Sequence, residues 1–95
     1  MIYHPEANEE LLDAMWWYED RRAGLGDEFL QAIFDAEAQI AEAPLRWAEV
    51  APGFRKLNAQ RFPYGLIYHL VRGEVEIVAV MHLSRRPGYW RVRVK

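Results

Sequence analysis

The feature that most constrains the fold is a predicted β-hairpin in the second half of the chain. Residues Phe62–Val71 are almost all apolar and rich in aromatic and β-branched side chains, which favour strands. Arg72-Gly73 interrupts this run, and glycine tolerates the positive φ that a tight hairpin turn requires. Residues Glu74–Leu83 then alternate, which predicts a second strand whose side chains point to opposite faces in turn. One face is predicted to carry Val75, Ile77, Ala79, Met81 and Leu83, and the other Glu76, Val78, Val80 and His82.

Two amphipathic helices are predicted before this hairpin. The first begins at Pro5, whose missing N–H is harmless at the start of a helix, and ends near Gly24. The second is predicted over Asp27–Glu42, and Pro44 marks its end. Because only a short segment joins them, we expect the two helices to pack as an antiparallel hairpin. Their predicted buried stripes are Ala7, Leu11, Ala14, Met15 and Tyr18 in the first helix and Phe29, Ile33, Ala36 and Ile40 in the second.

Two further strands complete the predicted architecture. Met1–His4 is a short strand candidate, and Phe54–Gln60 is a half-polar strand that suits a position near a sheet edge. Leu45–Gly53 is expected to be a loop. The predicted order is strand–helix–helix–strand–strand–strand. We therefore expect a single α+β domain over residues 1–95, with a helical hairpin packed on one face of a mainly antiparallel sheet.

The composition excludes several classes of protein. There is no cysteine among the 95 residues, so disulfides and thiolate metal sites are excluded. The three histidines lack a metal-binding spacing and no glycine-rich loop matches a nucleotide-binding fingerprint, so we expect neither metal nor cofactor. No apolar run approaches the roughly 20 residues of a membrane span, and the first residues lack the features of a signal peptide. A cytoplasmic protein with no membrane contact is expected.

Charge is distributed unevenly along the chain. Residues 1–51 carry twelve acidic and three basic side chains, a net charge of −9, whereas residues 52–95 carry two acidic and nine basic ones, a net charge of +7. We expect the basic half to form a face that attracts phosphate groups or an acidic protein segment. The alternative is that the two halves neutralise one another within the fold.

Five short motifs span nearly the whole chain: His4-Pro5-Glu6-Ala7, Trp17-Tyr18-Glu19, Leu25-Gly26-x-x-Phe29-Leu30, Arg61-Phe62-Pro63-Tyr64 and His82-x-x-Arg85-x-Pro87-x-x-Trp90. Together they resemble the RelE/ParE superfamily of bacterial toxins. They occur in the same order as in that family. The resemblance implies the α+β architecture already expected from the residue pattern. It also implies the toxin of a type II toxin–antitoxin system, with a cognate antitoxin protein as partner.

The superfamily offers two molecular targets, of which we favour DNA gyrase. Proteins that resemble ParE block the gyrase cycle without catalysis, so the basic C-terminal residues would serve as a contact surface. The chain is net acidic, at −2 with a pI near 5.9, which disfavours entry into a ribosomal site lined with RNA phosphates. The predicted target-binding residues are Arg85, Arg86, Trp90, Arg91 and Arg93, with Lys95 beyond them.

The alternative target is mRNA on the ribosome, cut as the RelE-like nucleases cut it. Metal-free cleavage of a phosphodiester needs a base, an acid and cations that stabilise the transition state. By resemblance, the catalytic candidates are Arg61, His82, Arg85 and Tyr89, while Lys56 and Arg86 are further basic candidates. A third possibility is a non-toxic module that keeps this fold and binds an antitoxin.

The antitoxin is expected to bind through a flexible segment. Such a segment can lie in a groove between helical hairpin and sheet, or add to a strand. The predicted antitoxin-binding residues are Trp16, Trp17 and Arg86. Tryptophan is enriched where partners anchor, and the basic half of the chain would attract an acidic antitoxin tail. We expect toxin and antitoxin to form an oligomer.

Overall fold

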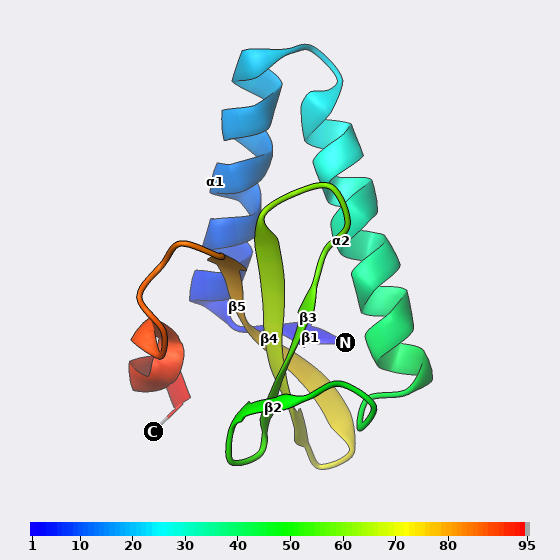
Figure 1. The fold of residues 1–95 in the computed structure, drawn as a ribbon, viewed down its shortest axis with the longest axis vertical. Coiled ribbons are helices and arrows are strands. Elements are labelled where there is room, and N and C mark those ends of the chain that lie inside the picture. The colour runs from blue at the N-terminus through cyan, green and yellow to red at the C-terminus, as the bar shows by residue number, and fades with distance from the viewer. Residues whose placement is uncertain (95) are drawn as a thin grey trace.

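The fold is a helical hairpin packed against a five-stranded sheet, as the computed structural model of residues 1–94 shows (Figure 1). The strand order is β1-β5-β4-β3-β2, with β1 parallel to β5 and every other pair antiparallel. The expected α+β architecture is therefore confirmed. The elements are β1 (Ile2–Tyr3), α1 (Pro5–Arg21), α2 (Leu25–Glu42), β2 (Glu49–Ala51), β3 (Phe54–Asn58), β4 (Tyr64–Val71), β5 (Glu74–His82) and the 3-10 helix η1 (Tyr89–Val94).

Several element ends lie one to three residues from their predicted positions, and two short elements were not predicted. The segment expected to be a loop contains the short strand β2, which pairs with β3. Helix α2 begins at Leu25, two residues before the predicted start, because Gly24 adopts φ = 89° and ends the turn between the helices. The C-terminal segment forms η1, which the sequence did not predict.

The two helices approach each other closely at Gly26. A Cβ atom added there would lie 2.9 Å from the backbone oxygen of Met15, so only glycine fits between the helices. The Glu19 side chain of α1 accepts hydrogen bonds from the amides of Gly24 and Gly26, at 3.0–3.1 Å. These amides would otherwise lack partners at the start of α2. One carboxylate of α1 thus caps α2 and fixes the angle between the helices.

A β-bulge in β5 overturns the strict alternation predicted for that strand. Ile67 pairs with Ala79 but the next residue of β4, Tyr68, pairs with Ile77, which leaves Val78 as an extra residue. Side chains beyond the bulge therefore exchange faces. Val75, Ile77 and Val80 belong to the core beneath the helices, whereas Val78, Ala79 and Met81 belong to a second cluster.

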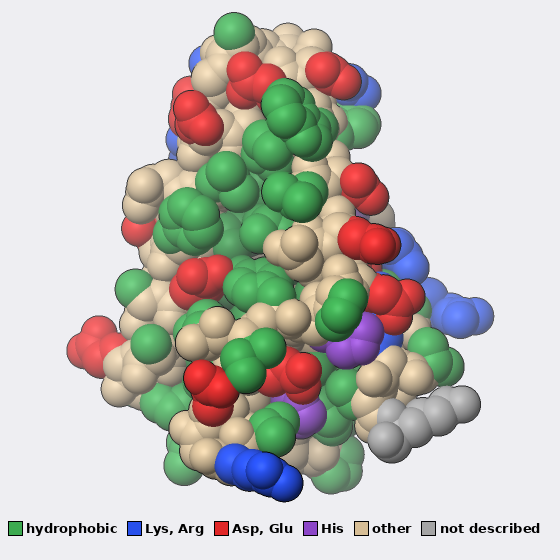
Figure 2. Space-filling model, turned by 180° about the vertical axis from the view of Figure 1, so that it is seen from behind, with side chains coloured by type: hydrophobic (Ala, Val, Ile, Leu, Met, Phe, Trp, Pro, Cys, Tyr) green, Lys and Arg blue, Asp and Glu red, His purple; other side chains and the backbone are tan. Residues whose placement is uncertain are grey.

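The sheet is covered on both faces. Between helices and sheet lies the main core, which includes an aromatic group of Tyr18, Phe29, Phe62 and Tyr64. On the opposite face η1 brings Trp90 against the second cluster, with its ring centroid 4.9 Å from that of Phe54. Viewed from behind, the outer surface of the two helices shows hydrophobic side chains gathered at its centre (Figure 2). Within residues 1–94, neither helix has the length and apolar character needed to cross a membrane.

Candidate functional site

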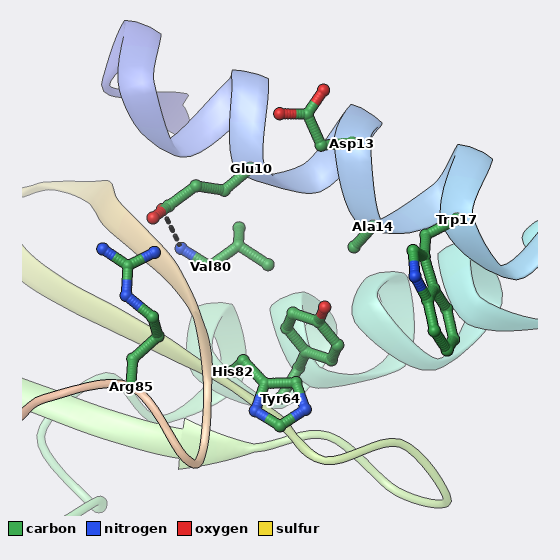
Figure 3. A pocket seen from close by; sticks show the side chains of 8 residues that line it. All are labelled: Glu10, Asp13, Ala14, Trp17, Tyr64, Val80, His82 and Arg85. Atoms are coloured by element: carbon green, nitrogen blue, oxygen red, sulfur yellow. Dashed lines mark hydrogen bonds between the residues drawn. The ribbon is translucent and has the colours of Figure 1, made fainter.

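Two hollows lie on either side of Arg85, just beyond the end of β5. The helix-side pocket, of about 450 Å³, lies between α1 and the sheet, with Arg85 and Trp17 at its two ends and Tyr64 and His82 on its floor (Figure 3). The sheet-side pocket, of about 370 Å³, opens on the other face of the sheet. Arg85 lines both. The helix-side pocket is lined by Glu10, Asp13, Ala14, Trp17, Tyr64, Val80, His82 and Arg85. The sheet-side pocket is lined by Val50, Lys56, Ile67, Met81, Leu83, Arg85, Pro87, Gly88, Trp90 and Arg91.

The bulge is what places His82 in the helix-side pocket. Its Nδ1 accepts a hydrogen bond from the Ser84 amide at 3.1 Å and lies 2.7 Å from the Ser84 hydroxyl. Because an amide can only donate, this Nδ1 is unprotonated and the proton of the neutral ring resides on Nε2. The ring also packs edge-on against Tyr64, with centroids 5.1 Å apart. His82 is thus held by the turn that follows β5, with Nε2 as its donor.

Glu10 joins α1, β5 and η1 in one polar cluster. Its carboxylate accepts hydrogen bonds from the Val80 amide at 3.0 Å, the Tyr89 hydroxyl at 2.6 Å and both terminal nitrogens of Arg93 at 2.8–2.9 Å. Arg93 also donates to the Val78 carbonyl at 3.0 Å. Strand β1 pairs with β5 only at Glu76 and Ile77. Beyond that pairing, the side chains of Glu10 and Arg93 provide hydrogen-bond partners for the backbone at the edge of β5.

This cluster shifts the pKa values of its members. Burial raises the pKa of Glu10, but the hydrogen bonds from Arg93, Tyr89 and Val80 outweigh burial and lower it overall. Burial, followed by the hydrogen bond to Glu10, raises the pKa of Tyr89 well above its usual value. The hydrogen bond to Glu10 raises the pKa of Arg93. Glu10 is therefore a carboxylate and Tyr89 a neutral phenol at pH 7. Glu10 is not predicted from the sequence, because its partners lie 70 or more residues away along the chain.

The structure does not bring the four candidate nuclease residues together. Only His82 and Arg85 share a pocket. The Tyr89 hydroxyl donates its hydrogen bond to Glu10. The Arg85 guanidinium lies over the Tyr89 ring, 3.9 Å from the ring centroid. Arg61 forms an ion pair with Glu28 of α2 at 2.8 Å. The further candidate Lys56 lies in the sheet-side pocket.

The predicted target-binding residues fall into two groups. Arg85, Arg86 and Arg91 are exposed and form no ion pair within residues 1–94. Trp90, at 2% exposure, is buried in the second cluster, and the Arg93 side chain, at 9% exposure, faces Glu10. Lys95 lies outside the described residues. The part of this surface open to a partner is therefore its three exposed arginines.

The predicted antitoxin-binding residues do not form one site. Trp17 is 51% exposed and lines the helix-side pocket, with the Arg21 guanidinium 3.7 Å from its ring centroid. Trp16 is 60% exposed, and its neighbouring position on α1 turns it about 100° away. Arg86 lies on the loop after β5. Among residues 1–94, no three His, Asp or Glu side chains are grouped to hold a metal ion.

Comparison with solved structures establishes the fold class. The chain is similar to a structure described as "Chromosomal ParDE TA system from P. aeruginosa", with a TM-score of 0.65 and 18% sequence identity. The match covers 86% of this chain and 92% of the other. At this identity the likeness shows the shared fold. No curated protein matches the sequence.

The family follows from a second comparison. The family model described as "ParE toxin of type II toxin-antitoxin system, parDE" matches residues 1–87, so the chain belongs to this family. The resemblance and the type II toxin function predicted from the five motifs are confirmed. Membership of a toxin–antitoxin family also implies an antitoxin partner. The matched residues include Arg85 and Arg86 but end before η1.

Proposed function

We propose that this toxin inhibits DNA gyrase in the cytoplasm, and that it does so by binding rather than by catalysis. The contact surface in this proposal is the basic surface, formed by the exposed Arg85, Arg86 and Arg91 together with Lys56 at the rim of the sheet-side pocket. The observation that carries the proposal is that the three arginines form no ion pair within residues 1–94. Such cations are available to a partner at little desolvation cost to the toxin itself.

The placement of the nuclease candidates also favours binding over cleavage. The Tyr89 hydroxyl donates a hydrogen bond to Glu10 and its pKa is raised, so it is a poor general base or acid for RNA. Arg61 is held by Glu28 and lines neither of the two pockets beside Arg85. A metal-free ribonuclease needs these groups around one phosphate.

The cognate antitoxin is proposed to occupy the helix-side pocket and to form an oligomer with the toxin. An antitoxin segment there would pack on Trp17 and reach Arg85. Because Arg85 lines both pockets, this segment would compete with gyrase for one side chain. The antitoxin would then neutralise the toxin by occupying Arg85, which the contact with gyrase also requires.

The target is tested with purified proteins. We expect the toxin to inhibit supercoiling by gyrase, and Arg86→Ala and Arg91→Ala each to weaken inhibition about tenfold. Arg61→Ala is the matched control, because it removes an exposed arginine outside the basic surface and should leave inhibition unchanged. In parallel, defined mRNA on programmed ribosomes should stay intact. Codon-positioned cleavage that Arg85→Ala abolishes would replace this proposal with the endonuclease function, and inactivity in both assays would indicate a non-toxic module.

The antitoxin site is tested by affinity measurements. Trp17→Ala and Arg85→Ala should each weaken binding of the cognate antitoxin, while the thermal stability of the toxin stays near that of the wild type. If Trp17→Ala and Arg85→Ala both left the affinity unchanged, the antitoxin would have to bind elsewhere.

A further inference from the structure

The outer face of the helical hairpin carries an apolar strip that the proposed function does not use. Leu12, Trp16 and Phe34 are 43%, 60% and 48% exposed. Monomeric proteins leave single apolar side chains in water, but several such residues gathered on one face indicate an interaction surface. Figure 2 shows hydrophobic side chains gathered over the two helices, with acidic side chains around them.

Helix geometry puts the three side chains on the same face. Leu12 and Trp16 are four residues apart, so they are neighbours along one side of α1. On α2, Gly26 touches the backbone of α1, and the row that continues at steps of four runs through Leu30 to Phe34. Each step of four residues turns the side chain by about 40° around α2, so the row moves from the contact between the helices at Gly26 to the outer surface at Phe34. The result is an apolar strip along the outer face of α1 and α2, formed by Leu12, Trp16 and Phe34, which we call the hairpin strip.

The two helices that carry the hairpin strip are strongly acidic, which indicates the charge of its partner. Residues 5–42 carry eleven acidic side chains and two arginines. Both arginines are engaged, because Arg21 stacks on Trp17 and Arg22 pairs with Glu28. In contrast, three acidic residues at helical spacing from Leu12, Trp16 and Phe34 form no ion pair within residues 1–94. These are Glu9, Asp20 and Asp27.

We propose that the hairpin strip binds a basic amphipathic helix of a partner protein, at a site separate from the helix-side pocket. Apolar residues of that helix would pack on Trp16, Leu12 and Phe34, and its Lys and Arg side chains would meet the unpaired carboxylates. A second copy of the toxin suits the hairpin strip poorly, because two acidic hairpins repel each other. An acidic helix would be repelled in the same way.

The binding partner is tested with three synthetic peptides of about 18 residues. The first is helical, with leucines at a spacing of three and four and lysines elsewhere. The second has the same leucines with glutamates in place of lysines, and the third scrambles the first. We expect only the first peptide to bind wild-type toxin with appreciable affinity. Added salt should weaken this binding, because it screens the attraction between lysines and carboxylates. Equal binding of the scrambled peptide would reduce the interaction to charge alone and overturn the proposal, as would binding of the acidic peptide.

The location is tested by comparing neighbouring tryptophans. Trp16→Ala and Phe34→Ala should each weaken the basic peptide about tenfold, equivalent to about 1.4 kcal/mol. Trp17→Ala, which alters the helix-side pocket instead, should change its affinity less than about twofold. Neither Trp16 nor Phe34 is buried, so the variants should remain folded, as thermal unfolding can verify. An equal loss in Trp17→Ala, or toxin dimers that Trp16→Ala disrupts, would contradict the assignment.

Discussion

Replacing Glu10 with glutamine should destabilise the toxin and release its C-terminal helix. The glutamine retains the shape of the side chain but removes the charge. Three of the four hydrogen bonds to Glu10 come from Arg93 or Tyr89. Hydrogen bonds to a charged group contribute about 1.5–3 kcal/mol each and neutral ones about 1 kcal/mol. Glu10→Gln should therefore lower the free energy of unfolding by about 2–3 kcal/mol, or Tm by on the order of 10 °C for a chain of this size.

The same substitution should change how stability depends on pH. The folded-state pKa of Glu10 lies below its unfolded value, so its contribution is fully present above the unfolded pKa, near 4.5. That contribution is lost as pH falls through the folded pKa. Urea unfolding of the wild type between pH 7 and pH 3 should therefore show a loss that Glu10→Gln lacks.

Glu9→Gln is the matched control for this prediction. Glu9 is the adjacent residue, is exposed, and forms no ion pair within residues 1–94. Its substitution should change stability by no more than about 0.5 kcal/mol. Two results would show that the Glu10 cluster does not hold η1. One is an equal loss of stability in Glu10→Gln and Glu9→Gln. The other is that Glu10→Gln loses as much stability between pH 7 and pH 3 as the wild type.

Three further substitutions test the packing by urea unfolding. Trp90→Ala should lower the free energy of unfolding by about 3–5 kcal/mol, because the side chain is 2% exposed; a loss below 1 kcal/mol would show that η1 is not part of the core. Gly26→Ala should lower it by about 1–3 kcal/mol, since its Cβ would lie 2.9 Å from the Met15 carbonyl, and an unchanged midpoint would disprove the close approach. Arg61→Ala should lower it by less than about 1 kcal/mol, as the Arg61 side chain that pairs with Glu28 is 61% exposed, and a larger loss would give this ion pair a structural role.

The helices and the β4–β5 hairpin could be predicted because their signals are local. The apolar spacing identified both helices, and Arg72-Gly73 marked the turn, where both residues adopt positive φ, at 53° and 80°. The bulge at Val78 could not be predicted, because an extra residue leaves the hydrophobic pattern of an all-apolar stretch unchanged. Strand β2 is only three residues long and depends on its pairing with β3, which no local pattern reveals.

The site was harder to predict than the fold because its contacts are non-local. Arg85 was identified from its motif, and the structure places it between the two pockets. Glu10 is one of several glutamates at the start of α1, and only the folded chain sets it apart from its neighbours by bringing Arg93 to it. The separation of Trp16 from Trp17 was available from the sequence, since consecutive residues of a helix point about 100° apart.

The most direct test of the proposed target is pulse labelling of DNA and protein synthesis after the toxin is induced in a bacterial host without antitoxin. Inhibition of gyrase predicts that DNA synthesis falls first and that cells become filamentous, with Arg86→Ala and Arg91→Ala delaying both effects and Arg61→Ala delaying neither. A fall in protein synthesis that precedes any change in DNA synthesis would contradict the gyrase proposal and indicate mRNA cleavage instead.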